Sequence, residues 1–482
     1  MHLPEMLHHL DVDAYLARIG YAGSREPTGA VLDALHEAHV TAIPFENLDV
    51  RLGRPISLAI ADLEAKIVAR GRGGYCFEQN ALFAAALGEL GFAVETLEAR
   101  VRGGAAVVRP RTHMTLTVAL PGGPRLCDVG FGSDGPLRSV PLDGTPSRQD
   151  ADDFRVVREG GDMVLQAARE GHARDLYVFC GRPALPVDYE VANHYTATWP
   201  RSGFVQTPTV QWTRPGERHV LRGRQYERRT AEGVDRRAVT LDEAVRLVRE
   251  AAGLPLDEVD AVRALGPAIS QASDQALLVA YGRFSAGLQE DIARLLRALR
   301  STPPPGLVDL HPGYGSLLVR YDPRRTDAAS LEEVVRARLV LWQHDAPAER
   351  ERLVEIPVVY GGHHGPDLLE VAREAGLTPE RVIELHTGAV YRVAFLGFTA
   401  GFPYLSGLPD ALTVARLPSP RRLVPAGSVA IAGGQAGIYP QATPGGWRLL
   451  GRTPLRLFRP EADPITLLRM GDRVRFLPQA AP

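Results

Sequence analysis

The sequence predicts an α+β protein of several domains, and three observations lead to this class. At 482 residues the chain is too long for one hydrophobic core and suggests about three domains. Residues 11–92 have mostly helical periodicity, whereas residues 94 to about 205 alternate between apolar and polar in short runs typical of strands. A new alternation of strands and helices begins near residue 274, so we expect a change of domain there.

The composition is that of a soluble globular protein, with 45% hydrophobic and 23% charged residues. The net charge of −2 argues against nucleic acid or an anionic membrane as the main partner. Cys76, Cys127 and Cys180 are too few for a disulfide framework, which fits a reducing cytoplasm. We find no signal-peptide pattern, no apolar run near the roughly 20 residues that span a bilayer, and no metal-ligand spacing. A cytoplasmic protein without a bound metal is therefore expected.

The predicted helices begin at polar residues that can cap them. Asp11 or Asp13 can cap a first helix, and Thr28 can cap a second one that runs through Leu35. Thr240 precedes an acidic first turn and is expected to begin a later helix, which ends at Gly253.

The second half of the chain begins after a segment that we interpret as a linker. Residues 266–273 are small and polar and include a proline. The order of the elements that follow is β-α-β-β-α, which predicts a small ferredoxin-like subdomain over residues 274–348. These elements are expected at residues 275–281, 287–300, 307–310, 316–321 and 330–343. From about residue 353 the chain is rich in strands, glycine and proline.

Cys76 stands where a run of helical periodicity begins. In the first turn of a helix, free backbone N–H groups and the helix dipole favour a thiolate over a thiol. Arg72 adds a positive charge nearby, and Gly73 and Gly74 allow a sharp backbone turn. Glu78 would oppose the thiolate, so we expect it to point away from the sulfur. The alternative is a small apolar cysteine at the start of a buried helix.

Two further residues complete a candidate triad. His113 begins a strictly alternating strand, and Asp128 ends a second strand beyond a Pro-Gly-Gly-Pro turn. A cysteine nucleophile needs a base that takes its proton and a third group that holds the base in one tautomer. Cys76, His113 and Asp128 supply these groups, which predicts a cysteine-protease-like Cys-His-Asp core.

The strand register poses a difficulty for this triad. If residues 122–123 formed a two-residue turn, Asp128 would lie opposite Thr117. His113 would then lie four residues further along the strand, roughly 13 Å away. A bulge, a bend or a different register is required, and all three remain open.

Six segments of the first half form a family pattern: Ile43–Leu48, Arg72–Glu78, Arg111–Met114, Asp128–Gly132, Asn193–Tyr195 and Pro200–Phe204. On these segments, residues 1 to about 265 resemble the arylamine N-acetyltransferases. The resemblance implies a domain over residues 1–266, in which a helical bundle, a β-barrel and an α/β tail follow one another. It implies two-step acyl transfer from acetyl-CoA to an arylamine-type amine through acyl-Cys76, with an amine pocket lined by Phe131, Phe204 and Val101. We place Arg72 among the substrate-binding residues as well.

A second family pattern includes the segments Ile356–Gly362, Gly365–Leu368, Gly401–Leu405, Val424–Val429, Gly437–Pro440 and Gly445–Trp447. On these segments the second half, about 270–482, resembles the 5-oxoprolinase B subunits, a family also described as the first subunit of allophanate hydrolase or as a sporulation kinase inhibitor. It implies a cyclophilin-like carboxyltransferase barrel over residues 349–482. It also implies ATP-dependent opening of 5-oxoproline, shared with a large-subunit-like partner protein. The chain has Ala400 and Ala436 where this resemblance leads us to expect proline and threonine.

The glycine-rich loops of this half have two interpretations. They are turns of a compact barrel, or they form a pocket where the backbone approaches a ligand. We place His386, Gln435 and Arg452 in such a pocket. The chain has no Gly-x-x-x-x-Gly-Lys-[Ser/Thr] motif, so a nucleotide-binding site for ATP would be atypical or shared with the partner.

Three functions are compatible with these patterns. The first is a bifunctional fusion, an acyltransferase joined to part of an ATP-dependent 5-oxoprolinase. The second joins the acyltransferase to a non-catalytic binding or kinase-inhibitor module. In the third, the first half is a thiol amidase or amide synthase. Acyl-CoA consumption that depends on an added amine separates the first from the third, and co-purification of a large subunit separates the first from the second.

Overall fold

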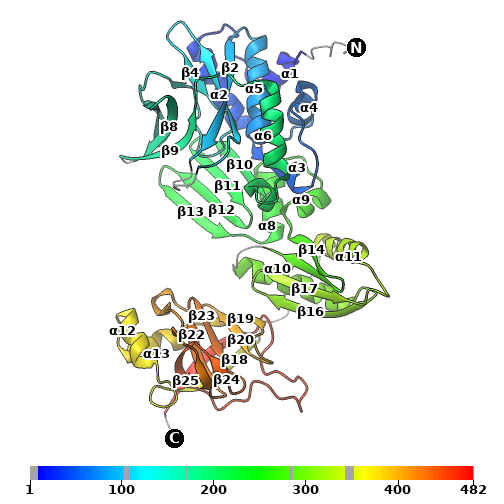
Figure 1. Cartoon of the computed structure of the whole chain (residues 1–482), viewed down its shortest axis with the longest axis vertical. Coiled ribbons are helices and arrows are strands. Elements are labelled where there is room, and N and C mark those ends of the chain that lie inside the picture. Colours follow the sequence, from blue (N-terminus) through cyan, green and yellow to red (C-terminus); the bar gives the residue numbers. More distant parts are fainter. Residues whose placement is uncertain (1–8, 103–107, 170, 282–285, 342–351, 481–482) are drawn as a thin grey trace. The chain divides into compact units, whose positions relative to one another are not determined.

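The computed structural model describes residues 9–102, 108–169, 171–281, 286–341 and 352–480. The chain divides into two compact units, Met1–Gly266 and Pro267–Pro482 (Figure 1). Among the described residues, no helix has both the length and the apolar character that a membrane crossing requires.

The first unit begins with helices, as the periodicity of residues 11–92 predicts. Asp11 accepts a hydrogen bond from the Ala14 N–H at 3.0 Å, and Thr28 accepts one from the Val31 N–H at 3.3 Å, so both predicted caps are present. The second helix extends to Ala42, beyond the predicted end. The elements are α1 (Val12–Arg18), α2 (Gly29–Ala42), α3 (Leu48–Arg51), α4 (Ile60–Leu63), the π-helix η1 (Glu64–Ala69) and α5 (Cys76–Glu89).

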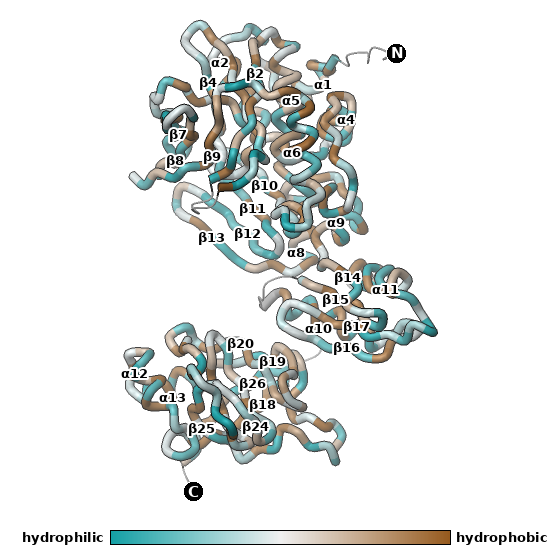
Figure 2. Tube along the Cα trace, viewed as in Figure 1, coloured by the Kyte–Doolittle hydropathy of each residue, from teal (hydrophilic) through white to brown (hydrophobic). Residues whose placement is uncertain are grey.

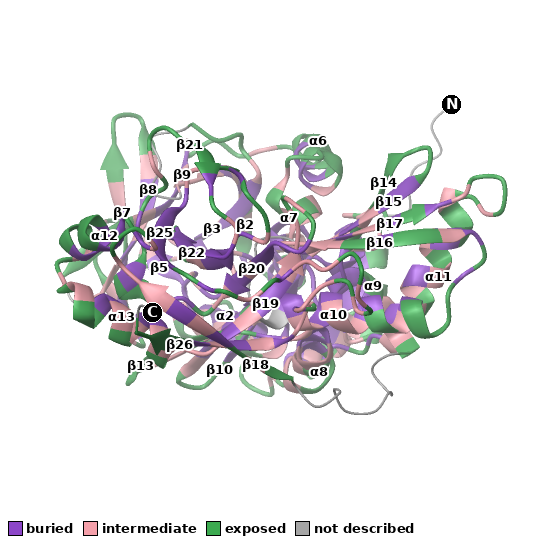
Figure 3. Cartoon of the chain, turned by 90° about the horizontal axis from the view of Figure 1, so that it is seen from below, coloured by how far each residue is buried: buried purple, intermediate pink, exposed green. Residues whose placement is uncertain are grey.

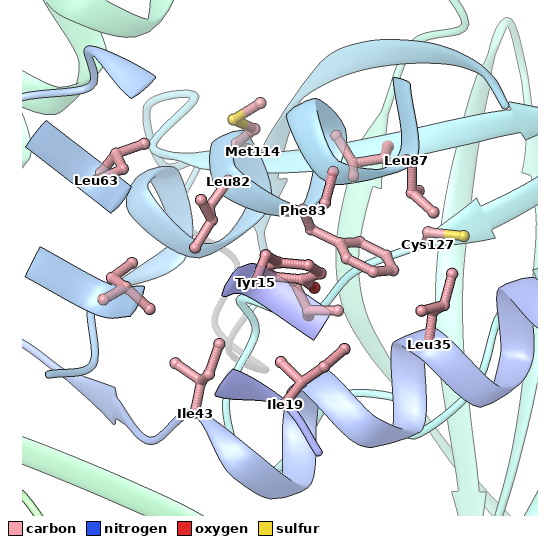
Figure 4. Close-up of a cluster of buried hydrophobic side chains, with 14 of the residues drawn as sticks. Tyr15, Ile19, Leu35, Ile43, Leu63, Leu82, Phe83, Leu87, Met114 and Cys127 are labelled. Atoms are coloured by element: carbon pink, nitrogen blue, oxygen red, sulfur yellow. The ribbon is translucent and has the colours of Figure 1, made fainter. Parts of the chain in front are cut away.

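A single apolar core joins these helices to the first strands. Phe83 of α5 is fully buried and lies among side chains of α1, α2 and the β-strands (Figure 4). Truncating a buried phenylalanine costs about 3–5 kcal/mol of stability, so this core holds α5 firmly in place. The labelled members of the cluster are Tyr15, Ile19, Leu35, Ile43, Leu63, Leu82, Phe83, Leu87, Met114 and Cys127.

An eight-stranded antiparallel sheet follows, in the order β5-β4-β3-β2-β9-β8-β7-β6. It curls so far that β5 lies against β7, and a second apolar cluster fills its inside. Because no hydrogen bonds pair β5 with β7 among the described residues, the predicted barrel of this region is a curled open sheet. The strands are β2 (Ala93–Val101), β3 (His113–Ala119), β4 (Arg125–Cys127), β5 (Val140–Pro141), β6 (Ser147–Gln149), β7 (Asp152–Glu159), β8 (Asp162–Arg169) and β9 (His172–Phe179).

The prediction of strands over residues 94–205 was wrong at its end. Residues Pro186–Thr198 form helix α6, and Gly203–Gln206 form the short helix α7. Pro186 occupies the first helical position, where its missing N–H costs nothing, and Asp188 accepts a hydrogen bond from the Leu185 N–H at 2.9 Å. These are helix-start signals that outweigh the apparent alternation.

The first unit ends in a five-stranded sheet, in the order β1-β10-β11-β12-β13, and a group of helices. Every residue of β12 is hydrophilic or nearly so (Figure 2). Thr240 caps α8 as predicted, accepting a hydrogen bond from the Glu243 N–H at 3.3 Å. The elements are β1 (Phe45–Glu46), β10 (Thr209–Arg214), β11 (Glu217–Arg222), β12 (Gln225–Thr230), β13 (Gly233–Ala238), α8 (Leu241–Arg246), the π-helix η2 (Leu247–Ala251) and α9 (Glu258–Leu265).

The second unit opens with a four-stranded sheet in the order β14-β15-β17-β16. The predicted β-α-β-β-α order is present, but residues 268–273, predicted as linker, form the edge strand β14. Most of their side chains are small or polar, and all but Ile269 are exposed, so the composition does not reveal a strand that pairs with β15 through its backbone. The elements are β14 (Ala268–Ser273), β15 (Ala276–Ala280), α10 (Ala286–Ser301), β16 (Leu307–Gly313), β17 (Ser316–Tyr321) and α11 (Ala328–Leu341). The last two residues predicted for the second helix lie outside the described residues.

The rest of the second unit is a closed barrel, in the order β18-β25-β22-β23-β20-β19-β26. Strand β22 is buried along its whole length (Figure 3). The barrel strands are β18 (Leu353–Tyr360), β19 (Tyr391–Leu396), β20 (Pro403–Ser406), β22 (Ser428–Ala432), β23 (Gln435–Ile438), β25 (Arg448–Arg452) and β26 (Arg473–Gln479). The other elements are α12 (Leu368–Ala375), α13 (Pro379–Gly388), the 3₁₀ helix η4 (Asp410–Leu412) and the paired strands β21 (Arg421–Val424) and β24 (Thr443–Gly445).

Candidate active site

Cys76 is the first residue of α5, in the first turn where the sequence places it. Its side chain is buried, and Sγ lies 3.7 Å from the Thr112 carbonyl oxygen. Glu78 points away from the sulfur, as expected, because its carboxylate accepts hydrogen bonds from the Tyr75 N–H at 3.1 Å and from Lys66 Nζ at 2.7 Å.

The structure brings the three predicted triad residues together. His113 Nε2 lies 2.5 Å from Asp128 Oδ2, and the Cys76 side chain lies close enough to the imidazole to raise its pKa. Because Asp128 occupies Nε2, the remaining nitrogen, Nδ1, is the one available to the thiol. All three side chains are buried, so their interactions act where water screens them little.

A different strand register resolves the predicted gap between His113 and Asp128. Cys127 pairs with Leu116, so Asp128 comes level with Thr115 rather than Thr117. Strand β4 ends at Cys127, and the chain then bends, which carries the carboxylate the rest of the way to His113. Two of the open alternatives, a changed register and a bend, therefore act together.

The buried pair has strongly shifted pKa values. Burial disfavours the imidazolium, but the Asp128 carboxylate and the Cys76 side chain outweigh it and raise the pKa of His113 to about 10. Burial likewise opposes the charged form of Asp128, yet His113 and further hydrogen bonds keep the pKa of this carboxyl below its usual value. The imidazolium and the carboxylate stabilise each other in place.

Sequence reasoning missed the residues that hold Asp128. Asn80, one turn along α5 from Cys76, donates from Nδ2 to Asp128 Oδ1 at 3.0 Å and to the Met114 carbonyl at 2.7 Å. His36 Nε2 accepts the Asp128 N–H at 3.0 Å. Asn80 lies four residues after Cys76, so helical spacing alone places it on the same face and could have identified it.

Gly130 lets the chain after Asp128 pass close to the nucleophile. A Cβ at this position would lie 2.8 Å from the Cys76 Cα and carbonyl oxygen and 2.7 Å from Asn80 Nδ2. Gly73 has a similar role, because a Cβ there would lie 2.1 Å from the Pro44 carbonyl oxygen. Neither glycine has a positive φ, so close approach rather than a sharp turn requires glycine at these positions.

Two of the predicted pocket residues lie beside the triad. The Phe131 ring meets the His113 ring edge to face, with centroids 5.1 Å apart. The Phe204 ring meets the Tyr75 ring in the same manner at 5.7 Å. Val101, at the end of β2, pairs with Tyr177, whose ring centroid lies 4.9 Å from that of His113. That Phe131, Phe204 and Val101 line an amine pocket remains a prediction.

Arg72 belongs to a buried ionic cluster below the start of α5. Its guanidinium donates to Glu46 at 3.0 and 2.6 Å and to Asp49 at 3.2 Å. Lys66 joins Asp49 and Glu78, each at 2.7 Å. Burial raises the pKa of Glu78 to about 7, although the Lys66 ammonium favours its charged form. The Arg72 guanidinium is thus bonded to carboxylates of the protein itself, and its role in substrate binding remains a prediction.

A cavity of about 510 Å³ adjoins this ionic cluster, and none of its lining residues belongs to the triad. It is lined by Asp49, Arg54, Pro55, Ile56, Ser57, Asp62, Leu63, Ala65, Lys66, Arg70, Arg72 and Glu78.

The structure does not bring together the residues predicted for a pocket in the second unit. Gln435 pairs with Ala432 and Arg452 with Ser428, at opposite ends of β22 and about 13 Å apart along the strand. His386 lies in the core, where its Nδ1 is 2.8 Å from the Tyr360 hydroxyl. Burial lowers the pKa of His386 to about 3, so its imidazole is neutral.

The glycines of this unit make room for aromatic rings. A Cβ on Gly437 would lie 2.8 Å from the Phe402 ring and 3.0 Å from that of Trp447, and a Cβ on Gly445 would lie 2.3 Å from the Tyr439 oxygen. The interpretation as parts of a compact barrel therefore holds at these two positions. Ala436 is also fully buried in the barrel core, so its methyl group lines the core.

Two family models match the chain, one for each unit. The N-acetyltransferase model matches residues 29–261, and the model for carboxyltransferase domain, subdomain C and D, matches residues 267–468. The arylamine N-acetyltransferase of Mycolicibacterium smegmatis is 41% identical over 222 residues, which are 45% of this chain and 81% of that protein. The 5-oxoprolinase B subunit of Bacillus subtilis is 43% identical over 223 residues, 43% of this chain and 91% of that protein.

Solved structures agree for the first unit. The M. smegmatis arylamine N-acetyltransferase superposes with a TM-score of 0.51 at 35% identity, over 53% of this chain and 98% of that one. The Nocardia farcinica arylamine N-acetyltransferase superposes with a TM-score of 0.51 at 39% identity, over 54% and 98%. The chain is therefore a fusion whose first unit belongs to the arylamine N-acetyltransferase family and whose second unit belongs to the family of 5-oxoprolinase B subunits.

Proposed function

We propose that the first unit is an acyl-CoA-dependent N-acyltransferase that acts on arylamine-type amines through an acyl-Cys76 intermediate. The observation that carries this proposal is the position of the His113 imidazole, which lies 2.5 Å from Asp128 and beside the Cys76 side chain. Membership of the arylamine N-acetyltransferase family supports acyl transfer over other thiol chemistry.

At the start of the first half-reaction the proton of the Cys76 thiol is already on His113, whose raised pKa favours the imidazolium, and the Cys76 thiolate attacks the carbonyl carbon of the acyl thioester. The carbon–sulfur bond to CoA breaks, and His113 returns the proton to the departing CoA sulfur. In the second half-reaction the amine nitrogen attacks the acyl-Cys76 carbonyl, and His113 takes the proton from nitrogen. Cys76 leaves as a thiolate, the amide is released, and His113 holds the proton until the next cycle. Asp128 fixes one orientation of the imidazole throughout.

The test is mass spectrometry of the full chain after incubation with acetyl-CoA and without amine. The protein should gain the mass of one acetyl group, and peptide mapping should locate it on Cys76. Addition of an arylamine should discharge the adduct and yield the acetylated amine. An adduct on Cys127 or Cys180 would contradict the proposal.

A thiol amidase is the competing function for the same three side chains. An amidase passes the acyl group to water, whereas an acyltransferase passes it to the amine. Acyl-CoA consumption that rises with amine concentration, with one amide formed for each CoA released, supports the transferase. Hydrolysis at an equal rate with and without amine would support the amidase instead.

We propose further that the second unit catalyses nothing alone and supplies one part of a 5-oxoprolinase to a large-subunit-like partner. Its similarity to the 5-oxoprolinase B subunit of Bacillus subtilis supports a role in such an assembly. The described residues of this unit contain no cysteine, and its core histidine, His386, is neutral and buried. Of the residues predicted for a ligand pocket in this unit, only Arg452 carries a charge, and its Nε is bonded to the Ala426 carbonyl at 2.8 Å. These residues do not fit an ATP site within this unit, so we derive no step through ATP.

The full chain should therefore show no ATP-dependent 5-oxoproline hydrolysis unless a matching large subunit is added. Co-purification of the two proteins with gain of turnover would support the proposal. Turnover by the chain alone would contradict it, and a stable complex without turnover would favour the binding or inhibitory module.

A further inference from the structure

Helix α6 carries a ridge of large apolar side chains that face water. Val187, Val191, Tyr195 and Trp199 follow one another at four-residue intervals, and Leu185 precedes them. All five are exposed, Val191 to 70%. The rings of Tyr195 and Trp199 stack with centroids 5.8 Å apart. An apolar stripe of this size on a folded protein is typical of an interaction surface.

The opposite face of α6 holds the helix rigidly in the first unit. The Tyr189 ring lies 6.2 Å from that of Phe77 in α5. Asn193 accepts a hydrogen bond from the Tyr75 hydroxyl and donates one to the Ile56 carbonyl at 2.9 Å. Because these contacts orient α6, the ridge is presented outward by the fold itself.

A carboxylate and an imidazole flank the ridge. Glu190 and His194 lie one turn apart on the same side of α6, and both are exposed. Within the described part of the chain neither side chain has a hydrogen-bond or ion-pair partner. The imidazole of His194, which can donate a hydrogen bond, and the carboxylate of Glu190, which can accept one, would suit a surface that carries the same two groups in reverse order.

We propose that this ridge is a homodimer surface, on which the α6 helices of two copies of the chain pack antiparallel about a two-fold axis level with Ala192. In that register Glu190 lies opposite His194 of the second copy, and Leu185 lies opposite Trp199. Each copy contributes the same surface, as a two-fold interface requires. A parallel arrangement would instead place Glu190 beside Glu190, which costs energy.

The size of the ridge sets the expected strength of the dimer. From Leu185 to Trp199 the ridge extends about 21 Å at the helical rise. Stable interfaces bury about 1,200–2,000 Å² in total, and one helix from each copy lies at or below the lower end of that range. We therefore expect a reversible dimer with a dissociation constant in the micromolar range.

The experiment is sedimentation velocity on the full chain from about 1 to about 100 µM. The wild type should pass from monomer to dimer across this range. Val191→Arg should remain a monomer, because it places two charges at the centre of the interface. Val259→Arg is the matched control, since Val259 is exposed on another helix, α9, and this variant should dimerise like the wild type.

A charge exchange tests the register itself. Glu190→Lys should weaken the dimer at least several-fold, and the double variant Glu190→Lys/His194→Glu should restore it. Thermal unfolding should be unchanged in all variants, because each site is exposed. A monomeric wild type at 100 µM, or a Val191→Arg variant as dimeric as the wild type, would overturn the proposal. A double variant as weak as Glu190→Lys would overturn the antiparallel register.

Discussion

Cys76 and Cys127 are both buried thiols, but their neighbours differ. Cys76 faces the His113 imidazole, whereas Cys127 lies in the apolar core beside Leu35 (Figure 4). Burial raises the pKa of the Cys127 thiol, so this cysteine has no route to a thiolate.

Cys76→Ser should therefore lower acyl transfer by on the order of 10³-fold or more, because a hydroxyl is far harder to deprotonate than a thiol. Cys127→Ala should retain most of the activity and lose about 1 kcal/mol of stability. Steady-state acetylation of an arylamine and chemical denaturation measure the two effects. Equal loss of activity in both variants would contradict the assignment.

The His113–Asp128 pair makes stability depend on pH in a defined sense. The pKa of His113 is raised from 6.5 to about 10, so its interactions add to the free energy of unfolding in full below pH 6.5. This stabilisation is lost as the pH rises through about 10. The pKa of Asp128 is lowered, so its interactions add to the free energy of unfolding in full above its ordinary pKa of 3.8. This stabilisation is lost as the pH falls through the lowered pKa. The pair is thus most stabilising between about pH 4 and 6.5.

We therefore expect the difference in unfolding free energy between wild type and His113→Gln to be largest in that window and to shrink steadily towards pH 10. Denaturant titrations at a series of pH values provide the measurement. A difference that grows between pH 7 and 10 would show that the imidazole is neutral in the folded protein.

At the scale of elements, the hairpin of β3 and β4 determines whether the triad assembles. The residue types of the triad could be predicted, because a cysteine at a helix start and a histidine and an aspartate on neighbouring strands have recognisable local patterns. The register could not be predicted, because it depends on how residues 120–124 turn and on the bend after Cys127. The contact between Gly130 and Cys76 is equally invisible in the sequence, since 54 residues separate them and only the packed fold brings them together.

Strand β14 and helix α6 are two elements that the sequence analysis assigned wrongly. Local composition suggested a linker for the former and strands for the latter. Strand β14 forms because it pairs with β15, and α6 forms because of the residues at its first turn. The average composition of a segment reports neither the pairing partner nor the residues at one position.

Gly130→Ala should disturb the active site through this element. The added methyl group meets the backbone of Cys76, which cannot move freely, so we expect a loss of about 1–3 kcal/mol of stability and a lower rate of acyl-enzyme formation. Gly122→Ala is the control, because a Cβ on this glycine in the turn before β4 meets no atom within 4 Å. Calorimetry and single-turnover mass spectrometry give the two readouts. Identical behaviour of both variants would show that the close approach at Gly130 does not matter.

At the scale of the whole molecule, the two units are predicted to fold independently, because each has its own core clusters and the boundary falls at Gly266. Separately expressed residues 1–266 and 267–482 should each unfold cooperatively.

A shorter second fragment, residues 274–482, tests the boundary more sharply. It lacks β14 and should be less stable than residues 267–482, because β15 loses a paired neighbour. If the two fragments are equally stable, residues 268–273 behave as the linker that their composition suggests.

The joint between the units has a consequence for how the cell makes this protein. Helix α9 ends at Leu265 and β14 begins at Ala268, so only Gly266 and Pro267 stand between them. A ribosome that completes the first unit starts the second within two codons. Translation of this chain therefore yields the two units in a ratio of one to one.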